Sequence, residues 1–145
     1  MKKEETQPTA IYYAHRPTTI YYAHHQWKYG TKIEEYELDL IKSYFPNSVI
    51  FNPATDLKSK DCGDEEIIMN ERLNKVLDSD ILIFSAMDGM IGIGVCNEVK
   101  AAEESGKLVL YLAQNKLHSS FYIYESPEFG SDRLYARVCV PMYEW

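Results

Sequence analysis

Short apolar runs alternate along the chain with segments whose apolar residues recur every three or four positions. The clearest run covers residues 80–85, DILIFS, and residues 19–23 and 107–112 have the same character. Continuous apolar runs of this length are typical of strands buried on both faces of a sheet. Residues 48–51 form a shorter β-prone run that ends at an Asn-Pro pair. We therefore expect four core strands.

Three amphipathic helices are predicted between these strands. The first follows Thr31, a residue type that caps helices, and the others cover residues 65–78 and 94–105. Gly106 supplies the glycine that commonly follows a helix. Residues expected to face inward are Ile33, Tyr36, Leu40, Ile41 and Tyr44 in the first helix, Ile68 or Met69, Leu73, Val76 and Leu77 in the second, and Val95, Val99 and Ala102 in the third.

The resulting β-α-β-α-β-α-β order defines the expected fold class. It predicts a flavodoxin-like or Rossmann-like three-layer α/β fold, with a mostly parallel sheet of about five strands and helices on both faces. Residues 54–64 are polar and are expected to form an exposed loop. Two more strands are expected at residues 119–124 and 133–140, either as an antiparallel edge or as a final parallel strand.

A short duplication precedes the fold. Residues 9–15 read TAIYYAH and residues 19–24 read TIYYAH, which is too short for a repeat architecture with units of at least about 20 residues. The second copy runs directly into a helix, so we take residues 19–145 as a single nucleotide-binding domain and residues 1–18 as an N-terminal extension. The first copy could be an added edge strand, an arm that pairs with another subunit, or an artefactual repeat.

Composition narrows the range of partners. The 145 residues, 46% of them hydrophobic, are enough for one core. The net charge of −7, with scattered lysines and arginines, argues against duplex nucleic acid as a partner. No apolar run approaches the roughly 20 residues of a membrane span, and residues 2–5 are charged where a signal peptide would be apolar, so a cytoplasmic protein without membrane association is expected. Three dispersed cysteines indicate neither a disulfide framework nor a metal site, and no cofactor is expected.

The loops after the strands hold the candidate ligand-binding residues, because open parallel sheets bind ligands beyond the carboxyl ends of their strands. The third loop is the most informative, since Asp88, Gly92 and Gly94 precede or open a helix whose free N–H groups attract a phosphate or carboxylate. A short link that simply needs glycine is the alternative. Glu98, in the first turn of that helix, is either a carboxylate aimed at a ligand or an acid that interacts favourably with the helix dipole.

Other candidates follow the first two strands: Trp27, Tyr29, His24, Lys28, Asn52 and Asp56. The two aromatic residues could stack on a base, the histidine could act as an acid, and the lysine could meet a phosphate. A surface loop with one packed aromatic residue is the alternative for this group. The last two residues could hold ribose hydroxyls, although turn formation explains them nearly as well.

Three patches resemble the nucleoside 2-deoxyribosyltransferases and the related deoxynucleoside 5′-monophosphate N-glycosidases. Residues 91–112, IGIGVCNEVKAAEESGKLVLYL, resemble the family's glycine-rich turn, glutamate, small-residue helix, "GK" and apolar strand. SDILIF at residues 79–84 resembles the family's "AD" and hydrophobic strand. IYYAH, which includes Tyr22, resembles the tyrosine-bearing first strand that opens the family's pocket.

The resemblance implies that Glu98 attacks the sugar carbon C1′ of a nucleoside or nucleoside monophosphate and displaces the base. It also implies a homodimer or higher homo-oligomer, in which the C-terminal segment completes a neighbour's pocket. The family usually carries an aspartate on the helix before the third strand, where this chain has Asn70, Glu71 and Arg72. Glu71 is the candidate second catalytic residue; if Arg72 faces the pocket instead, the site could bind a nucleotide without cleaving it.

Whether the protein is an enzyme therefore stays open. The alternatives are an N-glycosidase or deoxyribosyltransferase, and a non-catalytic protein that senses or sequesters a nucleotide-derived small molecule. A more remote third possibility is an NAD-cleaving domain of the TIR type, which shares the strand-helix alternation and also uses a glutamate.

Overall fold

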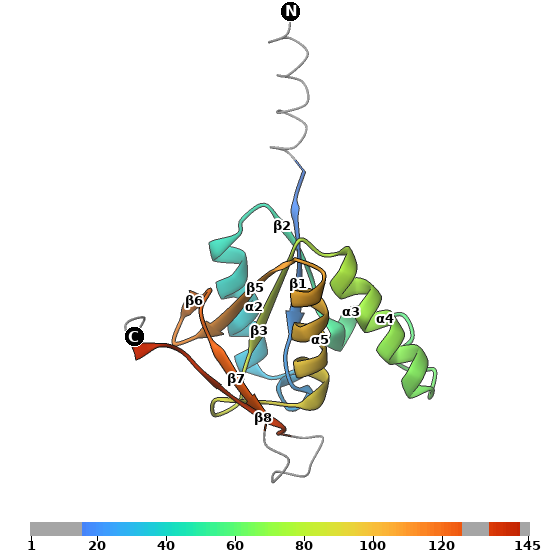
Figure 1. The fold of residues 1–145 in the computed structure, drawn as a ribbon. Helices are drawn as coiled ribbons and strands as arrows, with labels where there is room; N and C mark the ends of the chain where they lie inside the picture. The colour runs from blue at the N-terminus through green and yellow to red at the C-terminus, as the bar shows by residue number, and fades with distance from the viewer. Residues whose placement is uncertain (1–15, 126–133, 143–145) are drawn as a thin grey trace, which may run out of the picture.

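Four parallel strands form the centre of the sheet in the computed structural model, which describes residues 16–125 and 134–142. The sheet has the order β2-β1-β3-β5-β6, and only its last strand runs antiparallel. Its strands are β1 (Thr18–Ala23), β2 (Ser48–Phe51), β3 (Ile81–Ser85), β5 (Leu108–Ala113) and β6 (Lys116–His118). The predicted three-layer α/β fold with a mostly parallel five-stranded sheet is therefore confirmed (Figure 1).

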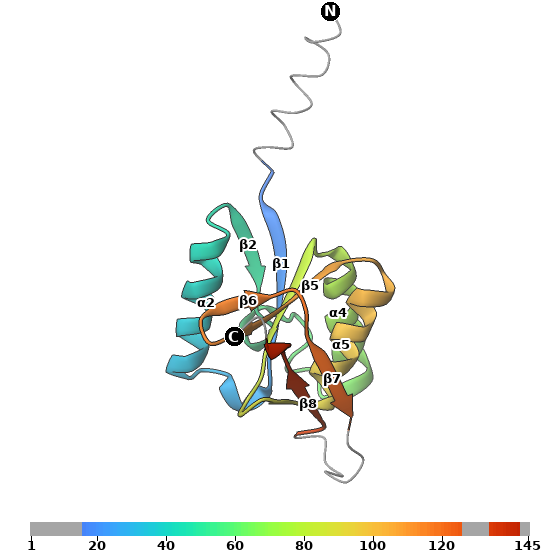
Figure 2. The same ribbon diagram turned by 60° about the vertical axis from the view of Figure 1, so that its left-hand side comes forward.

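The helices lie on both faces of this sheet. Helix α2 (Lys32–Tyr44) covers one face, and α4 (Glu65–Asp78) and α5 (Ile93–Glu104) cover the other, as the rotated view in Figure 2 shows. Thr31 caps α2, as predicted, through its hydroxyl oxygen, which accepts a hydrogen bond from the Glu34 N–H at 3.2 Å. Gly106 follows α5 with φ +72°, a conformation that glycine adopts at little cost.

Strand β1, an inner strand of the sheet, contributes side chains to two hydrophobic cores, one on each face. Neighbouring side chains of a strand point to opposite faces, so Tyr21 and Tyr22 enter different layers although both are fully buried. Tyr21 packs with Val95 and Val99 of α5, whereas Tyr22 packs with Ile41 of α2. This alternation decides which tyrosine can reach a site beside α5.

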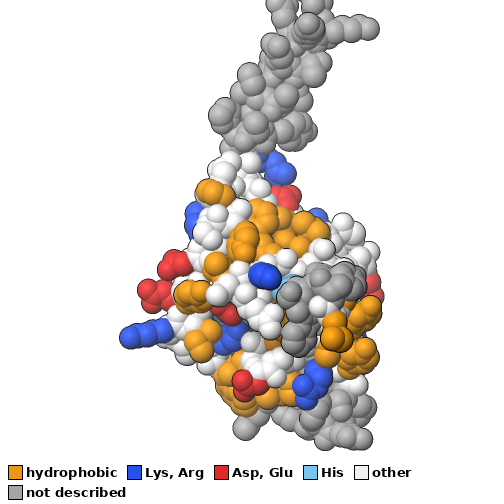
Figure 3. All heavy atoms as spheres, turned by 90° about the vertical axis from the view of Figure 1, so that its left-hand side faces the viewer, with side chains coloured by type: hydrophobic (Ala, Val, Ile, Leu, Met, Phe, Trp, Pro, Cys, Tyr) orange, Lys and Arg blue, Asp and Glu red, His pale blue; other side chains and the backbone are white. Residues whose placement is uncertain are grey.

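The inward face of α2 differs from the predicted one. The apolar residues that were predicted to be buried but are 44–58% exposed are Ile33, Tyr36 and Tyr44 of α2 and Leu77 of α4. Ile41 is buried as expected, but Glu34 and the partly buried Glu37 also face the sheet, where their carboxylates bind polar groups at the ends of β1 and β3. Figure 3 faces the α2 and β6 side and shows separate groups of hydrophobic side chains on this surface.

The C-terminal strands do not extend the main sheet, so both predicted arrangements were wrong. Strands β7 (Tyr122–Glu125) and β8 (Ala136–Cys139) instead join the two-residue β4 (Met90–Ile91) in a second antiparallel sheet of order β4-β8-β7. The edge of the main sheet beside β5 is already occupied by β6, which forms a tight hairpin with β5. A short helix, α3 (Pro53–Asp56), also lies within the predicted loop.

Several expectations concern parts of the chain outside the described residues. They are the first copy of the repeat at residues 9–15, most of the loop between β7 and β8, and residues 143–145 of the expected subunit interface. Within residues 16–125 and 134–142, no helix is long and apolar enough to cross a membrane.

Candidate functional site at the start of α5

A cavity of about 290 Å³ lies between the loop after β1, helix α4 and the first turns of α5. It is at the carboxyl end of β1, where ligands of parallel sheets are expected. Its lining includes residues that were predicted from the sequence as ligand-binding or catalytic: His24, Tyr29, Gly92, Gly94 and Glu98. The residues that it had not assigned to a ligand are His25, Gln26, Glu65, Met69, Ile93 and Val95, and Arg72 lines the cavity as well.

Glu98 is 4% exposed and lines this cavity. Its Oε2 accepts a hydrogen bond from the buried Tyr21 hydroxyl. Burial raises the pKa of Glu98 to about 7, although the Tyr21 bond and the positive charge of Arg72 both act to lower it. Near neutral pH, therefore, Glu98 exchanges between the acid and the carboxylate.

Tyr21, rather than the predicted Tyr22, is the tyrosine of β1 that hydrogen-bonds Glu98 at this site. The Tyr22 hydroxyl donates to Glu37 on the opposite face of the sheet, and Tyr22 does not line the cavity. The sequence shows that the two side chains point in opposite directions, but it does not show which face α5 covers. Burial, together with the nearby Glu98 carboxylate, raises the pKa of Tyr21 above its ordinary value.

Helix α4 presents Arg72 to the cavity and directs Glu71 elsewhere. The Glu71 carboxylate accepts hydrogen bonds from the Lys58 N–H at 2.9 Å and from the Ser59 N–H at 2.8 Å. These bonds and that of the Ser59 hydroxyl hold its pKa below the ordinary value. Successive helix residues point about 100° apart. Because Arg72 faces the cavity, its neighbour Glu71 lies outside it, contrary to the predicted catalytic position of Glu71.

His24 is a residue of the cavity lining, but its side chain is fully buried and both ring nitrogens face protein acceptors. Nδ1 lies 3.1 Å from the Tyr22 carbonyl oxygen, and Nε2 lies 2.6 Å from Glu34 Oε2. Burial lowers the pKa of His24, although its bond to Glu34 acts in the opposite direction. The ring also stacks on Tyr22, with centroids 3.8 Å apart. In this arrangement His24 offers a ligand neither a free ring nitrogen nor an exposed ring face.

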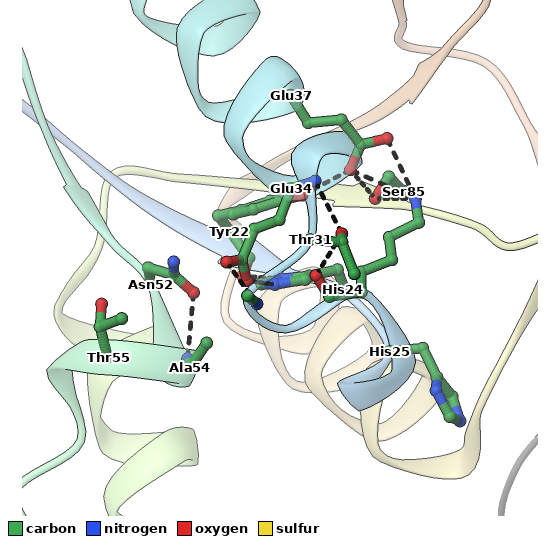
Figure 4. A network of polar contacts seen from close by, with 12 residues as sticks. Tyr22, His24, His25, Thr31, Glu34, Glu37, Asn52, Ala54, Thr55 and Ser85 are labelled. Atoms are coloured by element: carbon green, nitrogen blue, oxygen red, sulfur yellow. Dashed lines mark hydrogen bonds and ion pairs between the residues drawn. The ribbon is translucent and has the colours of Figure 1, made fainter.

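Lys28 belongs to a buried polar network on the α2 face, and Figure 4 shows its partners Glu37 and Ser85. The lysine is 5% exposed, and its Nζ lies 3.0 Å from Glu37 Oε2 and 2.9 Å from Ser85 Oγ. The Ser85 hydroxyl donates to Glu37 Oε1 at 2.7 Å. Lys28 is therefore not available to a phosphate in the cavity; it ties the loop after β1 to the end of β3.

Trp27, Asn52 and Asp56 do not line the cavity. Trp27 is 46% exposed and meets His25 edge-on, with ring centroids 4.7 Å apart. Asn52 Oδ1 caps α3 by accepting the Ala54 N–H at 3.0 Å, and Asp56 accepts the Asn52 N–H at 2.8 Å. The alternative of turn formation thus describes Asn52 and Asp56, and Figure 4 shows the Asn52 cap on Ala54.

The loop between β3 and α5 divides into a turn and a helix start. Asp88 and Gly89, with φ +51° and +75°, form the tight turn that joins Met87 to Met90, and Asp88 lies outside the cavity lining. Gly92 is the N-cap of α5, has no side-chain capping bond, and lines the cavity. Of the predicted loop residues, only those at the helix start therefore reach the site.

Comparisons with known proteins bear on the fold. No family model matches the sequence, and no curated protein matches it. A conserved protein from Enterococcus faecalis V583 is similar in structure, with a TM-score of 0.56 and 22% identity over 66% of this chain and 62% of that one. A 2-desoxiribosyltransferase from Leishmania mexicana gives a TM-score of 0.49 and 17% identity over 83% of this chain and 79% of that one. The chain thus spans less than two thirds of the E. faecalis protein, and at these identities the likeness concerns the α/β fold alone.

Proposed function

We propose that the cavity binds a nucleoside or nucleoside monophosphate and that Glu98 cleaves its N-glycosidic bond. The observation that carries the proposal is the buried Glu98 carboxyl group, which lines a ligand-sized cavity and is bound by the Tyr21 hydroxyl. Burying a carboxylate is costly unless it is paired, and no ion pair among the described residues includes Glu98. A role in chemistry accounts for a buried carboxyl group whose ionised form is costly to the fold.

The proposed reaction uses two displacements at the sugar carbon C1′. The ionised Glu98 attacks C1′ while the bond from C1′ to the base nitrogen breaks, and the base leaves with a proton taken from water. The resulting sugar ester is then attacked by water or by a second base, which restores the carboxylate. Two displacements at one carbon retain its configuration. The Tyr21 hydroxyl orients the attacking carboxylate.

Base release tests the proposal directly. The full chain is incubated with paired deoxynucleosides, ribonucleosides and their 5′-monophosphates, and free base is measured by chromatography. We expect release from at least one substrate and a loss of at least ~10³-fold in Glu98→Gln. Glu103→Gln, on the exposed side of the same helix, is the matched control. Base release that persists in Glu98→Gln contradicts the assigned role.

Binding without turnover is the second candidate, because Arg72 lines the cavity where the resemblance implies an aspartate. An arginine cannot protonate a leaving base, since its guanidinium stays charged. Mass spectrometry of ligands released by denaturing the purified protein separates the two functions. A stoichiometric intact nucleotide, with no base release from any substrate, favours the binding protein.

A further inference from the structure

Arg72 is the arginine of the cavity lining, and its positive charge acts on the neighbouring Tyr29 and Glu98. None of the ion pairs found among the described residues involves it. Its Nε is buried and has no hydrogen-bond partner within this part of the chain. Arginine carries five N–H donors and no acceptor, and its hydrogen bond with Tyr29 uses only part of them, so donors remain for a ligand. A guanidinium held in this way suits an acceptor-only group such as a phosphate.

The first turn of α5 adds to the positive character of the same wall. A Cβ on Gly94 would lie 3.8 Å from Arg72 Nη1, so the guanidinium rests beside the helix start. Because Gly92 provides no side-chain cap, the N–H groups of the first turn are left for another acceptor. The guanidinium and the helix start therefore favour an anion at one place in the cavity.

The size of the cavity limits the ligand. Its volume of about 290 Å³ is at the lower end of the range for ligand pockets, roughly 300–1,000 Å³. A single mononucleotide suits this volume better than a dinucleotide such as NAD. Glu98 and the exposed Glu65 are the acidic residues of the lining, so Arg72 also offsets their repulsion of an anion.

We propose that Arg72 and the first turn of α5 bind the phosphate of a nucleoside 5′-monophosphate, which the site takes in preference to the nucleoside. This inference rests on the proposed function, which supplies the nucleoside part of the ligand. Arg72 is then a specificity-determining residue: it acts on the affinity for the phosphate, whereas Glu98 acts on the glycosidic bond.

Calorimetric titration of the full chain tests the inference without depending on turnover. The ligands are a 2′-deoxynucleoside, its 5′-monophosphate and inorganic phosphate. We expect the monophosphate to bind the wild type at least about tenfold more tightly than the nucleoside, and Arg72→Gln to abolish this preference, so that the ratio of the two dissociation constants falls to about one. Arg137→Gln removes an exposed arginine of β8, outside the cavity, and should retain the preference.

The outcomes separate this inference from the proposed function. Equal affinities in the wild type, or a preference that survives Arg72→Gln, overturn the role of Arg72 even if Glu98-dependent base release is found. A preference that disappears in Arg72→Gln supports the role even if no base is released. Inorganic phosphate binding as tightly as the monophosphate overturns the assignment to a mononucleotide, and no binding of any ligand overturns both proposals.

Arg72→Lys provides a second variant if Arg72→Gln does not fold, as judged by circular dichroism. It keeps the charge but loses the planar fork of donors. We expect the preference for the monophosphate over the nucleoside to fall at least about threefold relative to the wild type. Unchanged binding of both ligands counts against the role of Arg72.

Discussion

The buried Glu98 should make the stability of this protein fall as the pH rises toward neutrality. Its pKa is about 7 in the folded protein, against an ordinary value of 4.5. Between these values the folded state keeps a proton that the unfolded state has released. The stabilisation is therefore fully present below about pH 4.5 and is lost as the pH rises through about 7. At ~1.4 kcal/mol per pKa unit, the difference between the two pKa values corresponds to about 3 kcal/mol of unfolding free energy.

The Glu98→Gln variant isolates this contribution, because glutamine does not titrate and can still accept the Tyr21 hydrogen bond. Urea unfolding of both proteins is followed by circular dichroism at pH 5, 6, 7 and 8. On going from pH 5 to pH 8, we expect the wild type to lose about 2 to 3 kcal/mol more than the variant. Subtracting the two curves cancels the contributions of all other groups. If the curves run parallel within about 0.5 kcal/mol, Glu98 is ionised throughout and the argument from its burial fails.

The remaining predictions concern the site and the fold. If Glu98 is the nucleophile, base release should increase between pH 6 and pH 8 as its carboxyl group ionises; a flat profile argues against this role. Tyr21→Phe should slow base release by about 10- to 100-fold, because a hydrogen bond to a charged group is worth about 1.5–3 kcal/mol. Tyr22→Phe is the control and should have little effect. Equal losses of base release in the two variants would contradict the assignment of strand faces. Lys28→Met should lower the free energy of unfolding by about 3 kcal/mol, because it leaves the partly buried Glu37 without its cation. The same urea titration of Lys60→Met, at an exposed lysine, is the control.

The local pattern of residues determined the order of the elements and much of their length. Residues 80–85, for example, are too apolar for an exposed segment and too short for a helix, and they form β3. Thr31 caps α2 as predicted because a side-chain oxygen needs only the N–H three residues ahead of it. Glu98 lies near the carboxyl edge of the sheet because the first turns of a helix that follows a parallel strand begin there.

The direction of each side chain was decided only by the tertiary structure. Tyr21 rather than Tyr22 meets Glu98, and Arg72 rather than Glu71 enters the cavity, because one position along a strand or helix reverses or turns a side chain. The spacing of apolar residues also predicted the wrong inward face of α2. His24 after β1 binds Glu34, and Ser85 at the end of β3 binds Glu37, so the face with these two glutamates lies against the sheet. Contacts between elements far apart in the chain set these rotations, and no local pattern records such contacts.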